Sequence, residues 1–256
     1  MVILGTRMAK PSISEGNVFN LVTGGSVVVL EYVNCFEIKV RHLDEFGHIS
    51  IVRSGNLQSG YIYNPYRKHA YGVGYTGEGE YKIKVNGKNS RAYDSWCRMM
   101  ERAYSDNFKS KHLTYKEVTV CNEWHNFQNF AEWFYQQPNA GKKGFHLDKD
   151  LMVQGNKEYS PVACSFVPQQ INALLTDRIN YRGNLPLGVG GEKGSFFVQI
   201  SIFGKLKKIG NFSTPKEASI VYKKTKEDYV KSVAKLYKDS IHPLVYENLM
   251  TWEVGE

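Results

Sequence analysis

The chain contains 256 residues, which is enough for two or three small domains, and its 42% hydrophobic content allows each of them a packed core. No apolar run approaches the roughly 20 residues that a membrane span needs, and the segment from Met1 to Lys10 lacks the pattern of an export signal, so we expect a cytoplasmic protein without a membrane partner. A formal net charge of +8, together with 13% aromatic residues, favours a polyanionic partner, because basic residues gain affinity by releasing counterions from phosphates.

The four cysteines argue against a zinc site. Cys35, Cys97, Cys121 and Cys164 form no Cys-x-x-Cys pair, which is the spacing typical of structural zinc. The same scatter gives little indication of disulfides. We therefore expect reduced, mostly buried thiols and no zinc.

The first part of the chain has a β pattern. Strand-like runs occupy residues 26–33, 36–42 and 47–53, and glycine-containing turn signals separate them. These runs predict a β-rich, SH3-like module over residues 1–70. Its outward basic side chains suit either a nucleic-acid backbone or the solvated rim of a protein-docking module.

The glycine-rich residues 72–77 match the dinucleotide-binding pattern only superficially. That pattern follows a strand and opens a helix. Here the strand-like residues 80–85 and an Asn86-Gly87 turn follow instead, which is typical of a hairpin. We expect a flexible joint followed by a hairpin.

Two amphipathic helices are predicted next. Residues 90–105 place Trp96, Met100 and other apolar side chains on one stripe at helical spacing. Residues 122–137 do the same around Phe127 and end before a proline. Both stripes are interpreted as core, and the helices are expected to brace the segment that follows.

Residues 144–172 carry the candidate chemistry. They predict a short strand ending at Asp148, a turn, a second strand closed by Pro168, and a helix that carries Asn172. Such a ββα unit can bring Asp148 close to Asn172. A carboxylate and an amide oxygen suit a hard cation such as Mg²⁺ or Mn²⁺, and a cation there could stabilise the leaving oxygen of a scissile phosphate.

This arrangement of acidic residue, polar turn, Tyr-Ser-Pro, apolar strand and helix with Asn resembles the zinc-free HNH (ββα-metal) endonucleases common in bacteriophages, including free-standing homing enzymes. The resemblance implies that Asp148 and Asn172 hold the metal, with Asp150 as a neighbour able to substitute. A phage-encoded protein of this kind would act in the host cell cytoplasm.

Two positions depart from the HNH pattern. In that family a His beside the metal-binding Asp activates water, and a strand Asn orients the first His of the motif. Lys149 and Ala163 stand at those places here. His146 is therefore the candidate base, and Lys149 a candidate for neutralising transition-state charge. The pair Lys142 and Lys143 precedes the unit and suits either phosphate contact or an ordinary charged loop.

The last third of the chain predicts a strand over residues 195–203, a turn at Gly204, a strand over residues 205–212, and a helix capped by Thr214 that runs to about Lys238. After this helix, residues 244–252 are too apolar for a loose tail and are expected to pack back onto a domain.

The run from strand to Gly-x-Phe-x-Thr-x-x-Glu-Ala resembles the APETALA2-type DNA-binding domain of plant ethylene-response factors, which phage HNH proteins often carry. That resemblance implies a three-stranded sheet in the major groove with a helix behind it. By strand alternation, Phe197, Gln199 and Ser201 would face the DNA, where Gln can pair with adenine. The lysines that suit phosphate or guanine contacts are Lys205, Lys207 and Lys208.

We therefore predict an α+β protein with three parts: an SH3-like module over residues 1–70, an HNH-like ββα domain with bracing helices over residues 71–182, and an APETALA2-like domain over residues 183–256. The leading hypothesis is binding and metal-dependent cleavage of double-stranded DNA. The alternative is a catalytically inactive HNH-like DNA-binding regulator or inhibitor of a host system, since a Lys in place of the base is protonated near neutral pH. A third hypothesis is a protein adaptor with a host protein partner. A palindromic DNA target would indicate a homodimer.

Overall fold

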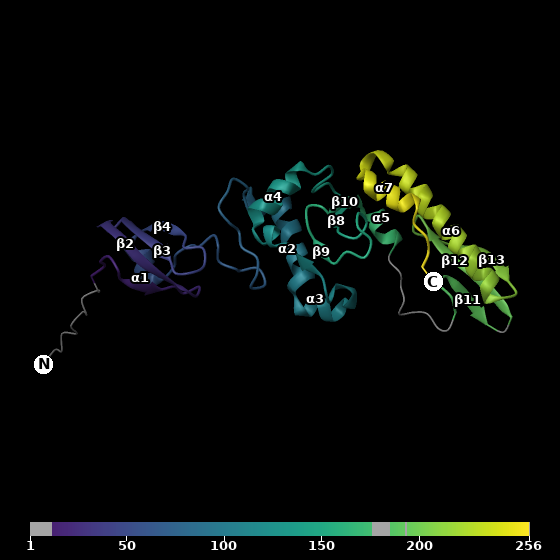
Figure 1. Cartoon of the computed structure of the whole chain (residues 1–256), viewed down its shortest axis with the longest axis horizontal. Helices are drawn as coiled ribbons and strands as arrows, with labels where there is room; N and C mark the ends of the chain where they lie inside the picture. Colours follow the sequence, from purple (N-terminus) through teal and green to yellow (C-terminus); the bar gives the residue numbers. More distant parts are fainter. Residues whose placement is uncertain (1–11, 176–184, 193, 256) are drawn as a thin grey trace. The chain divides into compact units, whose positions relative to one another are not determined.

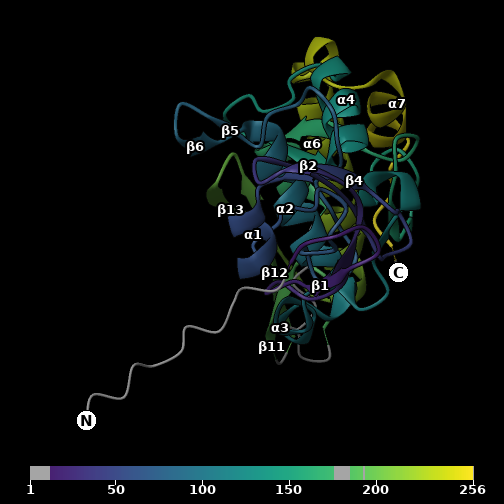
Figure 2. The same ribbon diagram turned by 90° about the vertical axis from the view of Figure 1, so that its left-hand side faces the viewer.

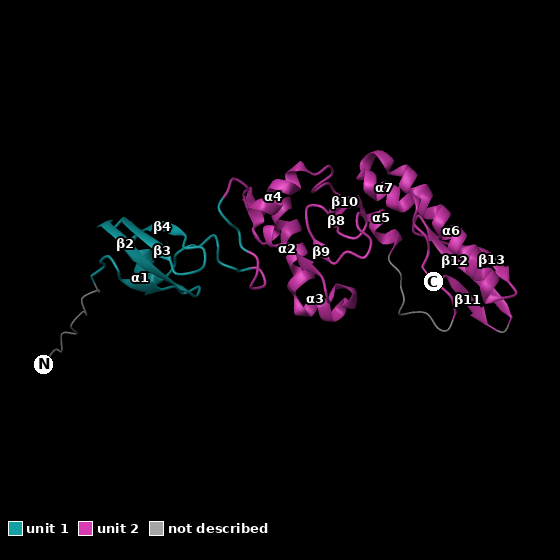
Figure 3. Cartoon of the chain, viewed as in Figure 1, with its two compact units in different colours: residues 1–69, 75–78 teal, residues 70–74, 79–256 magenta. Residues whose placement is uncertain are grey.

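The structure is a computed structural model that describes residues 12–175, 185–192 and 194–255. It combines helices with several small sheets, which confirms the predicted α+β class (Figure 1). The chain divides into two compact units (Figure 3): unit 1 takes residues 1–69 and 75–78, and unit 2 takes residues 70–74 and 79–256. Within the described ranges, no helix has the length and apolar character to cross a membrane.

Unit 1 is built on an antiparallel sheet of four strands in sequential order. The elements are β1 (Val18–Asn20), β2 (Ser26–Asn34), β3 (Glu37–His42), β4 (Ile49–Val52) and helix α1 (Ser54–Ser59). Ile38 and Val40 of β3 are buried while Lys39 between them is exposed, as the alternation of side chains along a strand requires. The buried side chains pack against Leu57 of α1 in one core. The sequence did not predict α1, a six-residue helix without a side-chain N-cap bond.

Unit 2 begins with a hairpin and continues into helices. The elements are β5 (Lys84–Val85), β6 (Lys88–Asn89), α2 (Arg91–Tyr104), α3 (Asp106–Lys111), η1 (Leu113–Tyr115), η2 (Asn122–His125) and α4 (Phe127–Gln136). Ser90 caps α2, because its Oγ accepts a hydrogen bond from the backbone N–H of Tyr93 at 3.2 Å. The second predicted helix is divided, because the Asn126 side chain accepts from the backbone N–H of Gln128 at 3.0 Å and so starts α4 anew after η2.

The helices of unit 2 enclose an aromatic core. Trp96, Trp124 and Phe130 are fully buried in it, and the indole N–H of Trp96 donates to the carbonyl of Trp124 at 2.8 Å. Gly74 lies directly against this core, since a Cβ there would come within 2.7 Å of Trp96 and Met100. The glycine-rich run is therefore packed at Gly74, where the sequence suggested a flexible joint.

The ββα unit follows. Its elements are β8 (Phe145–Asp148), β10 (Ser165–Pro168) and α5 (Gln169–Leu174). The loop between the two strands is longer than a hairpin turn, because β9 (Glu158–Tyr159) leaves the hairpin to pair in parallel with β7 (Thr119–Val120). The predicted order of strand, strand and helix is thus present.

The C-terminal part of unit 2 is a three-stranded antiparallel sheet with one long helix. The elements are β11 (Val189–Glu192), β12 (Ser195–Ile202), β13 (Lys205–Phe212), α6 (Pro215–Leu236), η4 (Lys238–Ser240) and α7 (Pro243–Met250). Thr214 caps α6 as predicted, accepting from the backbone N–H of Glu217 at 3.2 Å. Val198 and Ile200 of β12 are buried under α6.

The ββα unit and the C-terminal elements share a core. Val167 and Ile171 of the ββα unit belong to the same buried cluster as Val233 of α6 and Leu249 of α7. Lys226 of α6 also donates to the last carbonyl of α5, that of Leu174, at 2.6 Å. The segment after α6 therefore packs back onto the ββα unit, as its apolar composition predicted. The linker expected near residues 183–186 lies largely outside the described residues.

Candidate functional site

The register of the ββα unit fixes two of the candidate side chains. Asp148, the last residue of β8, lies opposite Ser165, and His146 lies opposite Val167. Because side chains two residues apart project from the same face of a strand, His146 and Asp148 point to the same side of the hairpin.

Asp148 is held in a defined orientation by the loop that follows it. Its Oδ1 accepts hydrogen bonds from the backbone N–H groups of Asp150 and Leu151, at 2.9 and 2.8 Å. Burial nevertheless raises the pKa of this carboxyl above its ordinary value, since the desolvation of the charged form outweighs the two hydrogen bonds. A nearby positive charge would therefore stabilise the ionised form of Asp148.

Asp148 and Asn172 line the same cavity, which has a volume of about 1020 Å³. Its walls come from α2, η1, the loop after β8, α5, and α7 with the residues after it. The lining residues that matter for its chemistry are Arg102, Tyr115, Asp148, Lys149, Asn172 and Asn248. The structure thus brings the predicted Asp and Asn to one site, together with groups from elements far away in the sequence.

Lys149 is engaged in structural contacts. Its ammonium group pairs with Asp150, donates to the carbonyl of Asn156 at 3.1 Å, and lies over the rings of Tyr115 and Tyr159 at 5.7 and 6.0 Å. Only 6% of the residue is exposed. The Lys149 side chain therefore forms part of the cavity wall. These contacts also direct Asp150 towards Lys149.

Arg102 is the functional candidate that the sequence reasoning missed. It lies on α2, is partly buried, and hydrogen-bonds to the hydroxyl of Tyr159. It lines the same cavity as Asp148, and the charges of the two groups interact weakly. The sequence did carry a signal for it. Arg98 and Arg102 lie one helical turn apart on a helix that was expected to brace the hairpin, which puts both charges on one helix face.

His146 is not one of the residues that line the cavity, but the charges of Arg102 and Arg98 act on its imidazole. Burial lowers the pKa of its imidazole, and the charges of Arg102 and Arg98 lower it further. A lowered pKa keeps the ring neutral near pH 7 and so able to accept a proton.

Asp148 and Asn172 carry a carboxylate and an amide oxygen, the donor types that hard divalent cations prefer, although the described residues contain no cluster of three or more His, Cys, Asp or Glu side chains that could hold a metal. Magnesium is commonly held by one or two protein oxygens, with waters and substrate phosphates completing its shell. Such an ion would stabilise the ionised form of a buried carboxylate whose pKa is raised. The third predicted ligand, Asp150, also lines the cavity but is paired with Lys149.

The outer face of the C-terminal sheet carries the predicted DNA-facing residues. Phe197, Gln199 and Ser201 alternate with the buried residues of β12, and Gln199 and Ser201 are exposed. Gln199 lies opposite Lys208, whose ammonium group is 5.3 Å from the ring centre of Phe197. One face therefore combines an aromatic ring, an amide and a cation.

Only one of the three predicted lysines of β13 lies on this face. Lys205 lies opposite Ile202, and Lys207 lies opposite the buried Ile200. Because directly paired residues project from the same side of a sheet, these two lysines belong to the side that α6 covers. Lys208 alone shares the outer face with Gln199.

Lys142 and Lys143 are exposed in the turn before β8. The Lys142 ammonium group lies 5.1 Å from the ring centre of Phe145 and donates to the side chain of Asn139 at 3.4 Å. The structure thus places the pair near the base of the ββα hairpin, since Phe145 is the first residue of β8.

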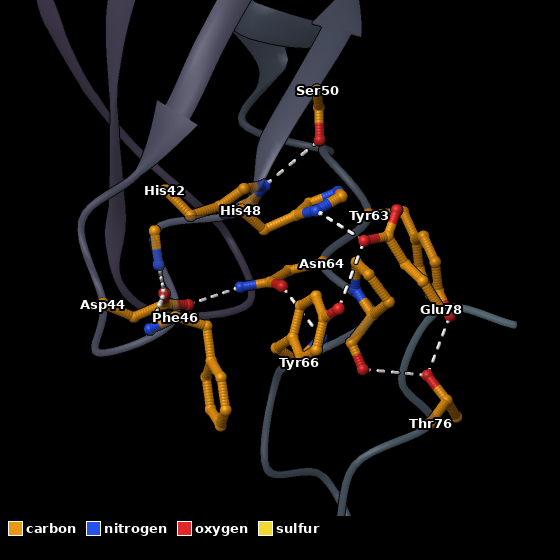
Figure 4. A network of polar contacts seen from close by, with 12 residues as sticks. His42, Asp44, Phe46, His48, Ser50, Tyr63, Asn64, Tyr66, Thr76 and Glu78 are labelled. Atoms are coloured by element: carbon orange, nitrogen blue, oxygen red, sulfur yellow. Dashed lines mark hydrogen bonds and ion pairs between the residues drawn. The ribbon is translucent and has the colours of Figure 1, made fainter. Parts of the chain in front are cut away.

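Unit 1 contains a separate polar network (Figure 4). His48 lies 3.3 Å from a Glu78 carboxylate oxygen and stacks on His42 at 5.6 Å between ring centres, while Asn64 donates to Asp44 at 2.6 Å. These contacts fasten the turn between β3 and β4 to Asn64 and Glu78 of the same unit.

Comparison with protein-family models, with curated proteins and with solved structures found no match to this chain.

Proposed function

We propose that this chain binds double-stranded DNA through the outer face of the C-terminal sheet and cleaves a phosphodiester bond at the cavity around Asp148, as HNH homing endonucleases do. In this proposal unit 1 is an SH3-like module, residues 79–175 form an HNH-like ββα domain, and residues 185–255 form an APETALA2-like domain.

One observation carries the proposal. The strand residue Asp148 and the helix residue Asn172 of a ββα unit line one cavity, and the cation Arg102 lines the same cavity. Oxygen donors for a divalent ion next to a fixed positive charge are the groups that phosphodiester hydrolysis requires, because negative charge builds up on the phosphate in the transition state.

Each residue has a role in this proposal. Asp148 and Asn172 would hold Mg²⁺ or Mn²⁺, which supplies Lewis-acid stabilisation of the phosphate oxygens when bound. Arg102 neutralises the phosphate, and its hydrogen bond to Tyr159 restricts the direction of the guanidinium. His146, which lies on the same face of the hairpin as Asp148 but does not line the cavity, is the candidate base for the attacking water. Lys149 holds the loop after Asp148 in place through its contacts with Asp150 and Asn156.

The outer sheet face supports DNA binding by its composition. Gln199 can form a bidentate pair with adenine, and Lys208 beside Phe197 can reach a phosphate. The sheet is backed by α6, so its outer side chains are presented on a rigid layer.

The position of Lys149 favours a second candidate function. A protonated lysine stands where the family has its general base, and it is committed to Asp150 and two tyrosine rings. A DNA-binding regulator that retains the ββα fold without cleavage fits this observation.

The test compares the wild-type chain with Asp148→Ala and with Asp228→Ala, an exposed aspartate of α6, on mixed phage and bacterial DNA with Mg²⁺, Mn²⁺ or chelator. We expect metal-dependent cuts by the wild type and Asp228→Ala, and none by Asp148→Ala. Terbium luminescence provides a second readout, since Trp252 and Tyr115 line the same cavity and can sensitise a bound lanthanide ion.

The outcomes separate the candidates. Intact DNA that is still retarded in a salt-dependent way supports the regulator, and terbium emission absent from the wild type contradicts the metal site. A wild-type protein that neither cuts nor retards DNA contradicts both functions.

A further inference from the structure

The hairpin of β5 and β6 stands out from the helices of unit 2 (Figure 2). Its tip is Asn86-Gly87, with φ angles of 51° and 75°. Two successive residues with positive φ are typical of a type I′ turn, whose twist matches that of a two-stranded ribbon. The hairpin is therefore a short, regular β-ribbon.

The base of the ribbon is fixed to two helices. The Gln128 side chain of α4 accepts from the backbone N–H of Tyr81 at 3.0 Å and donates to the Tyr81 carbonyl at 3.1 Å. The Tyr81 ring stacks on Tyr135, with 5.5 Å between ring centres. On the other strand, Asn89 donates to Asp94 of α2 at 2.9 Å. Contacts of Tyr81, before β5, and of Asn89, at the end of β6, restrict the direction in which the ribbon projects.

The ribbon carries three lysines and no acidic residue between Tyr81 and Asn89. Lys82, Lys84 and Lys88 are all exposed. No acidic side chain in the described part of the chain forms an ion pair with any of them. Their charges are therefore available to an outside partner.

The register distributes these charges over both faces. Lys84 lies opposite Asn89, and Lys88 lies opposite Val85, so the two lysines project from opposite faces of the ribbon. Val85 at the tip is 52% exposed. A narrow ribbon with a cation on each face is complementary to a groove bounded by anions on both sides.

We propose that the β5–β6 ribbon is a second DNA-contacting element, which enters the major groove and places its lysines on the phosphates of the two strands that border it. The major groove of B-DNA admits a two-stranded β-ribbon. This inference rests on the proposed DNA binding. The ribbon would add a contact surface separate from the sheet face. This surface would contact the DNA backbone rather than the bases.

The test is the salt dependence of DNA binding by the full chain with Lys82, Lys84 and Lys88 all changed to Gln. Each phosphate contact contributes a slope of about 0.9 to the plot of log affinity against log salt, so three lost contacts lower the slope by about 2.7. The control changes Lys216, Lys224 and Lys235 of α6 to Gln, which removes the same charge from exposed positions on another element. Its slope should stay near that of the wild type.

Hydroxyl-radical footprinting gives a second readout. We expect the ribbon variant to lose protection on both strands at one end of the site and to keep it where the sheet binds. Equal slopes and equal footprints for the wild type and the ribbon variant overturn this inference alone, since the wild type still binds. A wild type that does not bind DNA overturns the proposed function, and the ribbon proposal with it.

Discussion

The cavity around Asp148 and the outer face of the C-terminal sheet are two candidate sites built in different ways. The sheet face comes from two adjacent strands, and strand alternation alone selects Phe197, Gln199 and Ser201. The cavity collects Arg102 from α2, Asp148 from the end of β8 and Asn248 from α7. Its composition depends on how these elements pack.

This difference has a chemical consequence. Residues on the sheet face act next to solvent, where one side chain can be replaced with little effect on its neighbours. At the cavity, charges act on one another and on nearby groups: Arg102 influences Asp148, which lines the cavity, and His146, which does not. We therefore expect changes in the cavity to have large effects on cleavage and small effects on DNA affinity, and changes on the sheet to have the reverse.

The largest effect is expected from Arg102→Met. Removal of a positioned charge that stabilises a transition state typically lowers the rate by about 100- to 1000-fold. Single-turnover cleavage at saturating DNA measures this loss, and DNA affinity should change little. Lys235→Met, which removes an exposed cation of α6, is the control. Cleavage at the wild-type rate by Arg102→Met would remove this residue from the site.

A smaller effect tests the sheet. Lys207 and Lys208 are neighbours in sequence but project from opposite faces of β13. Lys208→Gln should lower the salt slope of DNA binding by about 0.9, the contribution of one phosphate. Lys207→Gln should leave the slope unchanged. If both variants lose the same slope, binding does not depend on the outer face of the sheet.

The smallest effect is expected in unit 1, which contains neither of these regions. Burial lowers the pKa of His42, and the neighbouring His48 lowers it further, while Asp44 acts in the opposite sense. A folded-state pKa below that of the unfolded chain means that the unfolded chain binds more protons. The contribution to stability is therefore complete above about pH 6.5, the ordinary histidine pKa, and is lost as the pH falls through the folded pKa.

Thermal unfolding of unit 1, followed by calorimetry at pH 7 and pH 5, should give a midpoint a few degrees lower at pH 5. His42→Gln, which retains a polar side chain near Ser50, should reduce this difference. An unchanged pH dependence in that variant would place the sensitive group elsewhere.

The sequence predicted best where one local rule decides the outcome. Thr214 caps its helix as expected, because a hydroxyl at the N-cap position accepts from a backbone N–H three residues later, and Ser90 at the start of the predicted helix over residues 90–105 does the same. Alternation along β12 placed Val198 and Ile200 inside. Asp148 and Asn172 share a cavity because the order of strand, strand and helix brings them together.

Prediction was weaker where the outcome depends on pairing between distant segments. The placement of Lys205 and Lys207 requires the register with β12, which shifts between Val198 and Gln199, and this irregularity leaves no signal in the sequence. Arg102 approaches Asp148 only after α2 packs against the hairpin. The side chain of Lys149 could also have projected outwards, and its burial depends on Tyr115 and Tyr159.

The core shared by the ββα unit and the last two helices limits how this protein can be divided or recombined. Asn248 of α7 donates to the carbonyls of Leu151 and Met152 at 2.8 and 3.0 Å, and so holds the loop that orients Asp148. A chain shortened before α7 would lose this support and expose the apolar faces of Val167 and Ile171. The C-terminal segment is therefore not an exchangeable module, and under the proposed function a new DNA preference would arise most readily by substitutions on the outer sheet face.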